Sequence, residues 1–193
     1  YLAGLMAADS IFELGADLFA LCAQMEGHPD NAAAALNGGV TICADGEVTR
    51  FDPPPGLEAV LVVPFAAVRT HQARSVIPVD VPIADATRNV AYACLLTLGL
   101  ATGDWDMLAR GLKDRLHQDR RAHLFPQSAA LLERAPALGA LGATISGAGP
   151  TVLVWCHYEQ TGRVVEGPRR ETDGWARVLR ALFEPMGADV RAL

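Results

Sequence analysis

Three consecutive prolines and a glycine, Pro53-Pro54-Pro55-Gly56, most strongly constrain how this chain can fold. Proline lacks a backbone N–H and fixes its own φ, so a regular helix or a central strand does not run through such a segment. The length of 193 residues suits one large domain or two small ones. We therefore expect a domain boundary here, with one domain at residues 1–56 and the other at residues 57–193.

Composition and charge exclude several classes of protein. Hydrophobic residues make up 51% of the chain and charged residues 20%, which is enough apolar material for a packed core. The net charge of −6 argues against a nucleic-acid or anionic-membrane surface. No apolar run reaches the roughly 18 residues of a membrane helix. Because the four cysteines lack the spacing of zinc or redox motifs, we expect them to be reduced core residues of a cytoplasmic protein.

The first part of the chain predicts helices followed by a strand. An apolar helix is expected over residues 1–14, ended by Gly15, and Asp17 can cap a second helix that runs to about Glu26. A third helix should begin near Asp30 and stop at the Gly38-Gly39 pair. Residues 40–44 then predict a strand that enters a turn at Asp45-Gly46.

The second part predicts an α+β domain. Strands are expected at residues 57–65, 139–143, 151–156 and 188–193, and helices at residues 70–77, 85–102, 104–117, 126–134 and 175–186. The last of these helices rests on the 3–4 spacing of Trp175, Val178, Leu179 and Leu182. Residues 157–172 are polar and predict a loop. Without the extra helices, the order β-α-β-β-α-β matches a ferredoxin-like α+β sandwich.

A cluster of polar residues, Glu26-Gly27-His28-Pro29-Asp30-Asn31, occupies the joint between two of the expected helices. The free N–H groups at the start of the outgoing helix favour an anion. The four alanines that follow would let this helix lie close to another group. Equally, the segment could be a simple helix corner in which Asp30 and Asn31 only cap the helix.

A glycine-rich turn is expected at residues 144–151, with the sequence Thr-Ile-Ser-Gly-Ala-Gly-Pro-Thr. Gly147 and Gly149 permit backbone conformations closed to other residues and allow a ligand to approach closely. Consecutive N–H groups there could bind phosphate or carboxylate. A tight connection between two strands is the alternative.

Two further segments concentrate arginine next to polar residues: residues 70–74, which end in Arg74, and residues 114–121, which end in Arg121. Arginine binds carboxylates and phosphates through two parallel hydrogen bonds. Each segment could also be a solvated, charged helix end.

Taken together, these four segments resemble the homoserine kinases of the GHMP small-molecule kinase superfamily. The glycine-rich turn is shared across that superfamily, whereas the His-Pro-Asp-Asn corner and the Arg-Leu-His-Gln segment at residues 115–118 look specific to homoserine kinases. The resemblance implies a GHMP kinase fold. In that fold, a partial N-terminal domain of the S5-like type precedes the ferredoxin-like C-terminal domain.

The resemblance also implies a role for each candidate residue. Glu26 resembles a magnesium ligand, and His28, Asp30 and Asn31 resemble the corner beside the homoserine pocket. Arg74 and Arg121 resemble the pair that grips the substrate carboxylate. The turn of Ser146, Gly147, Ala148 and Gly149 resembles the loop that supports the active site near the phosphates of ATP, and Gly147 would also contact the substrate. No residue is assigned as a catalytic base.

The implied activity is transfer of the γ-phosphate of ATP to the side-chain hydroxyl of L-homoserine, with Mg²⁺, in threonine biosynthesis. A homodimer is a further expectation. Residues 1–14 resemble the helix that follows the family's phosphate loop, so we expect that loop upstream of residue 1 and poor ATP binding by this chain alone. Another GHMP kinase, acting on mevalonate or a sugar alcohol, and a non-catalytic ligand-binding domain remain alternatives.

Overall fold

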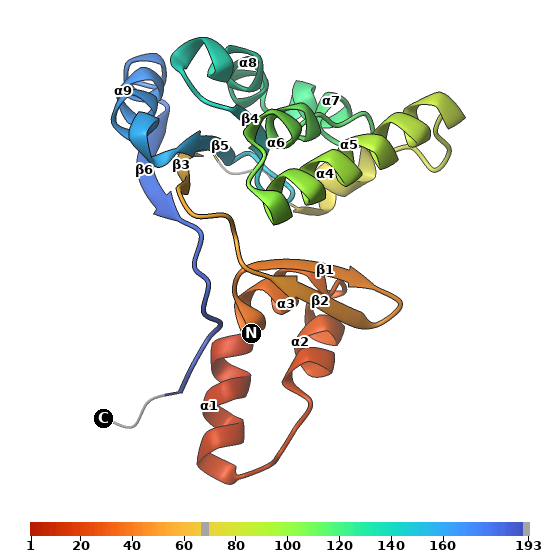
Figure 1. Cartoon of the computed structure of the whole chain (residues 1–193). Coiled ribbons are helices and arrows are strands. Elements are labelled where there is room, and N and C mark those ends of the chain that lie inside the picture. The colour runs from red at the N-terminus through yellow and green to blue at the C-terminus, as the bar shows by residue number, and fades with distance from the viewer. Residues whose placement is uncertain (67–69, 191–193) are drawn as a thin grey trace. The chain divides into compact units, whose positions relative to one another are not determined.

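The computed structural model describes residues 1–66 and 70–190, apart from the side chains of Thr70, His71 and Arg74 (Figure 1). The chain divides into two compact units, Pro54–Leu182 and Tyr1–Pro53 with the described part of Phe183–Leu193. The assignment of residues 1–56 and 57–193 to two domains stays a prediction. In the structure, the tail from Phe183 groups with the first unit.

The first unit consists of three helices, a hairpin and this tail. Its elements are α1 (Leu2–Phe12), α2 (Leu18–Glu26), α3 (Asp30–Asn37), β1 (Val40–Ala44) and β2 (Glu47–Phe51). Asp17 caps α2 as predicted, because its carboxylate accepts the Ala20 N–H at 2.9 Å. α1 ends earlier than expected, because Glu13 already takes the left-handed conformation, with φ 51°, at its C-terminal end. Leu2, Cys22 and Ala32 form a small buried core.

The tail lies along the first unit through backbone hydrogen bonds. The Gly39 N–H donates to the Glu184 carbonyl at 2.8 Å, and the Ala188 N–H donates to the Ala35 carbonyl at 2.8 Å. A β-carbon on Gly187 would lie 1.9 Å from the Leu36 carbonyl oxygen, so this close approach requires glycine. The tail therefore fixes the end of α3 opposite to the one that carries the polar corner.

The second unit is built on a four-stranded antiparallel sheet. The strands are β3 (Leu57–Pro64), β4 (Gly142–Ile145), β5 (Val152–His157) and β6 (Ala176–Leu182), in the order β4-β5-β3-β6. Its helices are α4 (Thr70–Ser75), α5 (Ile83–Thr102), α6 (Trp105–Gly111), α7 (Gln118–Arg121), α8 (Pro126–Arg134) and α9 (Thr161–Glu171), with 3-10 segments η1 (Ala122–Leu124), η2 (Ala135–Leu138) and η3 (Tyr158–Gln160). The first and third strands of the β-α-β-β-α-β order are neighbours, which confirms the predicted ferredoxin-like sandwich.

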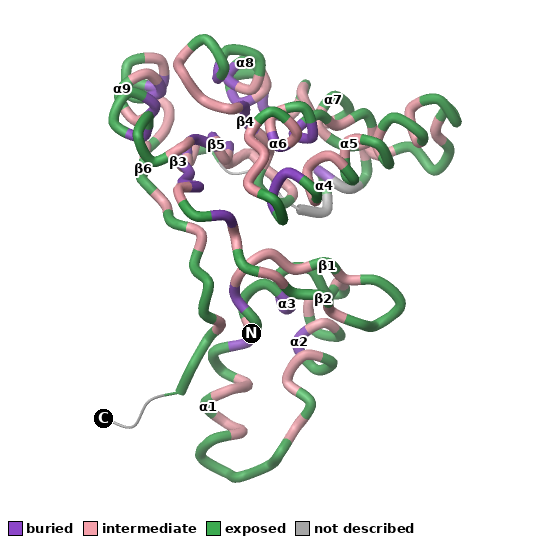
Figure 2. The backbone as a smooth tube through the Cα atoms, in the orientation of Figure 1, coloured by how far each residue is buried: buried purple, intermediate pink, exposed green. Residues whose placement is uncertain are grey.

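The core of the second unit lies between one face of this sheet and the helices α8 and α9 (Figure 2). Alternate residues of the two central strands point into it: Val60, Val62, Val152 and Val154. From the helices, Leu131 and Val164 fill the space above them. The result is a rigid support for the connection between β4 and β5, which carries the glycine-rich turn.

Two predictions for the last third of the chain are wrong. The expected loop at residues 157–172 contains η3 and α9, whose buried residues Thr161, Val164 and Pro168 follow helical spacing but are only weakly hydrophobic. The expected helix at residues 175–186 is strand β6, which pairs with β3 along its whole length. Pairing with a central strand outweighs the local spacing that suggested a helix.

The remaining differences are smaller. The expected helix at residues 104–117 ends at Gly111. Of the expected last strand, residues 188–190 have no regular structure and residues 191–193 lie outside the described residues. All four cysteines carry free thiols, but Cys94 is exposed rather than in the core. In the described part of the chain, no helix is both long and apolar enough to cross a membrane.

Candidate functional site

The polar corner in the first unit connects α2 to α3. Gly27 ends α2 in the left-handed conformation, with φ 77°, and its N–H donates to the Ala23 carbonyl at 2.9 Å. The Nδ1 atom of His28 lies 2.5 Å from Oδ1 of Asp30, and the same oxygen accepts the Asn31 N–H at 3.0 Å. Because an ionised carboxylate only accepts hydrogen bonds, Nδ1 carries the proton in this contact, and Nε2 is the other polar atom of the ring.

Two of the four alanines behind the corner are buried. Ala32 and Ala33 are 2% and 0% exposed, whereas Ala34 and Ala35 are exposed. Asp30 is the first residue of α3 and its side chain is 74% exposed. The corner thus presents a carboxylate, an imidazole and the start of a helix to solvent, on a helix held by small buried side chains.

Glu26 is the last residue of α2 and is half-buried. The Cys22 thiol donates to its Oε1 at 3.7 Å, a weak hydrogen bond. Burial raises the pKa of the Cys22 thiol, and the charge of Glu26 raises it further. Among the described side chains, no Lys or Arg forms an ion pair with Glu26. None of these cations therefore competes for its carboxylate oxygens, the kind of ligand that a hard cation needs.

The glycine-rich turn in the second unit joins β4 to β5. It is closed by hydrogen bonds from Ser146 N–H to the Thr151 carbonyl at 2.8 Å and from Gly149 N–H to the Ser146 carbonyl at 3.1 Å. Gly147 and Gly149 have φ values of 58° and 87°. A β-carbon on Gly149 would lie 2.9 Å from Phe125, whereas one on Gly147 would meet nothing within 4 Å. Gly149 is thus required by packing, and Gly147 leaves open space at the turn.

Arg121 lies between this turn and α4. Its Nε donates to the Ala73 carbonyl at 2.8 Å, and an Nη donates to the Gly147 carbonyl at 3.3 Å. Ala73 is buried and immediately precedes Arg74, whose side chain lies outside the described residues. The structure therefore brings Arg121 together with the glycine turn and with the backbone that carries Arg74.

Asp114 fixes the segment that leads into α7. Its carboxylate accepts the N–H groups of Leu116, His117 and Gln118 at 2.8, 2.9 and 2.7 Å. Burial on its own would raise the pKa of Asp114. The hydrogen bonds from the His117 side chain and from the backbone outweigh burial and hold this pKa well below its usual range. The carboxylate therefore stays charged and holds the start of the helix that carries Arg121.

Sequence reasoning assigned no role to Asp114 or to Gln118, whose side-chain Oε1 accepts the Ile145 N–H at 2.7 Å. An Asp just before a helical segment is a helix-start signal, so Asp114 could have been found from the sequence. The partner of Gln118 is 27 positions away, and nothing local indicates it.

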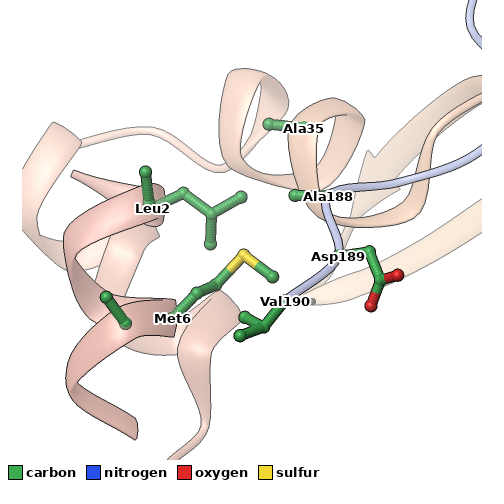
Figure 3. Close-up of a pocket in the computed structure, with 8 residues that line it drawn as sticks. Leu2, Met6, Ala35, Ala188, Asp189 and Val190 are labelled. Atoms are coloured by element: carbon green, nitrogen blue, oxygen red, sulfur yellow. The ribbon is translucent and has the colours of Figure 1, made fainter. Parts of the chain in front are cut away.

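The first unit also contains an apolar pocket. It has a volume of about 470 Å³ and is lined by Leu2, Ala3, Met6, Ala7, Ala35, Ala188, Asp189 and Val190. Leu2 and Met6 point into it from α1, while the Asp189 side chain points away from Met6 (Figure 3). None of the candidate residues lines this pocket. Within residues 1–66 and 70–190, no three His, Cys, Asp or Glu side chains group together as a metal site.

Comparison with known proteins gives the same family as the sequence motifs. The family described as GHMP kinases C terminal matches residues 96–170. The homoserine kinase of Moorella thermoacetica is 40% identical over 149 residues, which cover 75% of this chain and 50% of that protein. The homoserine kinase of Streptomyces avermitilis is 38% identical over 202 residues, covering 99% of this chain and 64% of that protein.

A solved structure shows the same fold. The crystal structure of homoserine kinase from Cytophaga hutchinsonii superposes with a TM-score of 0.89 at 23% identity, over 96% of this chain and 64% of that chain. The chain thus spans 46% to 64% of the length of the curated relatives it matches. The glycine-rich turn, helix α7 and the strands β4 and β5 lie within the matched residues 96–170, whereas β3 and β6 lie outside them. Residues 96–170 therefore match the GHMP kinase C-terminal family, and the chain is a partial homologue of homoserine kinases.

Proposed function

We propose that this protein is a homoserine kinase, which transfers the γ-phosphate of ATP to the side-chain hydroxyl of L-homoserine. The observation that carries the proposal is the position of Arg121. Its guanidinium contacts both the glycine turn and the backbone next to Arg74, in a chain 36–42% identical to curated homoserine kinases. Placement in threonine biosynthesis and in the cytoplasm, and a homodimeric state, stay predictions.

In the proposed site, Arg74 and Arg121 bind the substrate carboxylate. The hydrogen bond from Arg121 to the Ala73 carbonyl places the two arginine backbones on contacting elements, although they are 47 positions apart in the sequence. A pair of guanidinium groups suits an amino-acid substrate, because a carboxylate can accept two parallel hydrogen bonds from each. Mevalonate also has a carboxylate. Activity assays must therefore compare homoserine with mevalonate as the acceptor.

The turn of Ser146, Gly147, Ala148 and Gly149 would contact the phosphates or the substrate. Gly147 has open space where a side chain would stand, and its positive φ turns successive backbone groups toward one side. Phosphoryl transfer depends mainly on positioning and on neutralising charge. The backbone N–H groups of this turn would serve both by donating hydrogen bonds to the phosphates.

Glu26 would hold Mg²⁺ together with the phosphates of ATP. One carboxylate suits this ion, which usually keeps water and phosphate oxygens as its other ligands. When bound, Mg²⁺ spreads the negative charge of the transferring phosphate. We expect Glu26→Gln to raise the magnesium concentration that gives half-maximal activity, while the exposed Glu47→Gln should not.

His28, Asp30 and Asn31 would lie beside the homoserine. The Asp30 carboxylate orients the imidazole, which leaves Nε2 available to hydrogen bond with the substrate. The role proposed for this ring is orientation of the amino acid, and no residue is assigned as a base.

Product analysis tests the proposal. The natural full-length protein is incubated with MgATP and, in separate reactions, L-homoserine, mevalonate, shikimate or a diphosphocytidyl sugar alcohol, and products are identified by mass spectrometry. We expect O-phospho-L-homoserine with stoichiometric ADP and much slower turnover of the other alcohols. Faster phosphorylation of another alcohol would contradict the substrate assignment. Binding of homoserine and ATP without turnover would instead favour a non-catalytic domain.

A further inference from the structure

The side chains of Gln118 and Arg121 connect helix α7 to α4, to the glycine turn and to β4. Asp114 accepts three backbone N–H groups where the segment enters the helix. Arg121 contacts α4 and the glycine turn from the last position of the helix. Gln118 lies one helical turn before Arg121, on the same face. This helix therefore carries both a proposed substrate-binding residue and a second contact to the turn.

Gln118 binds the last residue of the edge strand β4. Antiparallel strands alternate between pairs that exchange hydrogen bonds and pairs that do not. Because the Ser146 N–H donates to the Thr151 carbonyl, the N–H of the preceding Ile145 faces away from β5. The side-chain Oε1 of Gln118 accepts it at 2.7 Å. The neighbouring β4–β5 ladder cannot supply this hydrogen bond.

We propose that Gln118 is a positioning residue for homoserine binding, which fixes the distance between Arg121 and the glycine turn. This role rests on the proposed function, since it assigns Arg121 to the substrate carboxylate. Ile145 is directly followed by Ser146 and Gly147, so a shift at Ile145 moves the turn. Arg121 itself holds the turn through one hydrogen bond of 3.3 Å, which is long and weak. Of these two hydrogen bonds, the one to Gln118 is the shorter and the stronger.

The test combines three variants. Gln118→Leu keeps a side chain of similar size but removes the acceptor oxygen. Gln118→Glu is a separate variant that keeps an acceptor oxygen at this position. Asp119→Asn is the control, because this side chain is 64% exposed on the same helix and pairs with Arg115 at 3.6 Å. Thermal unfolding of all variants shows whether they fold, and KM and kcat are measured for homoserine.

We expect Gln118→Leu to raise the KM for homoserine roughly 2- to 13-fold, the range that corresponds to loss of one neutral hydrogen bond. Gln118→Glu should restore most of this loss, and Asp119→Asn should behave as the parent. A purely structural role would lower the folded fraction, and hence the apparent kcat, without changing KM. An unchanged KM in a folded Gln118→Leu variant would overturn the proposal.

Amide hydrogen exchange separates this proposal from the proposed function. Gln118→Leu should speed exchange at Ile145, whereas Gln118→Glu and Asp119→Asn should not. This readout needs no activity. If the parent does not phosphorylate homoserine, the proposed function fails and the positioning role fails with it, even if exchange at Ile145 changes. If the parent is active and Ile145 exchanges equally fast in the parent and in Gln118→Leu, only the positioning role is overturned.

Discussion

At the scale of single residues, Glu58 is a buried carboxylate that joins two strands and a helix. Arg180 donates to both of its oxygens, at 2.8 and 2.5 Å, and the Thr161 hydroxyl donates to one of them at 2.7 Å. The hydrogen bonds from Arg180 and then Thr161 lower the pKa of Glu58, although burial opposes them. Its charged form is therefore the one that stabilises the folded unit.

Glu58→Gln should lower the free energy of unfolding by about 1.5–3 kcal/mol at pH 7, the usual contribution of a hydrogen bond to a charged group. Since the folded pKa lies below the unfolded value, this contribution is complete above about pH 4.3 and decreases as the pH falls toward the folded pKa. Urea unfolding at several pH values should thus show the parent and variant converging in acid. A constant difference at all pH values would contradict the account.

Glu166→Gln is the matched control for this measurement. Glu166 pairs with Arg169 at 3.1 Å, but both side chains are more than half exposed. Water and salt screen such a pair, so the change should cost about 0–1 kcal/mol.

The two glycines of the turn should respond differently to alanine. At Gly149 the new β-carbon would lie 2.9 Å from Phe125 and 3.0 Å from Ile145, so Gly149→Ala should cost about 2–4 kcal/mol in urea unfolding. At Gly147 only the left-handed backbone opposes alanine, at about 1–2 kcal/mol. Despite this small loss of stability, Gly147→Ala should reduce kinase activity, because the methyl group of the alanine occupies the space left for a ligand. Parental activity in a folded Gly147→Ala variant would remove this turn from the site.

At the scale of elements, the short helix α7 depends on Asp114. Asp114→Ala removes the acceptor of three N–H groups and should lower the free energy of unfolding by about 0.5–2 kcal/mol. Asp114→Asn keeps an acceptor oxygen and should cost less at pH 7. Urea unfolding compares the two variants, and equal losses would mean that the charge of Asp114, rather than its cap geometry, holds the helix.

Elements with clear sequence boundaries were predicted well. The strand β3 follows the proline run directly, and the hairpin turns at Asp45-Gly46, where both residues have positive φ. The last helix, α9, was predicted as a loop and the last strand, β6, as a helix, because their sequence patterns are misleading. α9 buries Thr161 and Pro168 beside a valine, so its inner face is not recognisably hydrophobic. β6 owes its form to β3, a partner more than a hundred residues away.

At the scale of the whole molecule, the resemblance located the candidate residues, but it could not give their contacts. Arg121 is 48 positions from its partner Ala73 and 26 from Gly147, and no local pattern indicates either contact. The grouping of the tail with the first unit was also missed. Backbone hydrogen bonds from Gly39 and Ala188 hold it, and such bonds leave little trace in a sequence.

The central proposal is that this protein phosphorylates L-homoserine and that Arg121 binds the carboxylate of this substrate. The most direct test compares kcat/KM for L-homoserine and for L-homoserinol, which lacks the carboxylate, in the full-length parent and in Arg121→Ala. We predict that the parent prefers L-homoserine. The variant should lose roughly 10- to 150-fold on L-homoserine, as for a charged hydrogen bond, and little on L-homoserinol. Equal losses on both alcohols, or a parent that does not phosphorylate L-homoserine, would contradict the account.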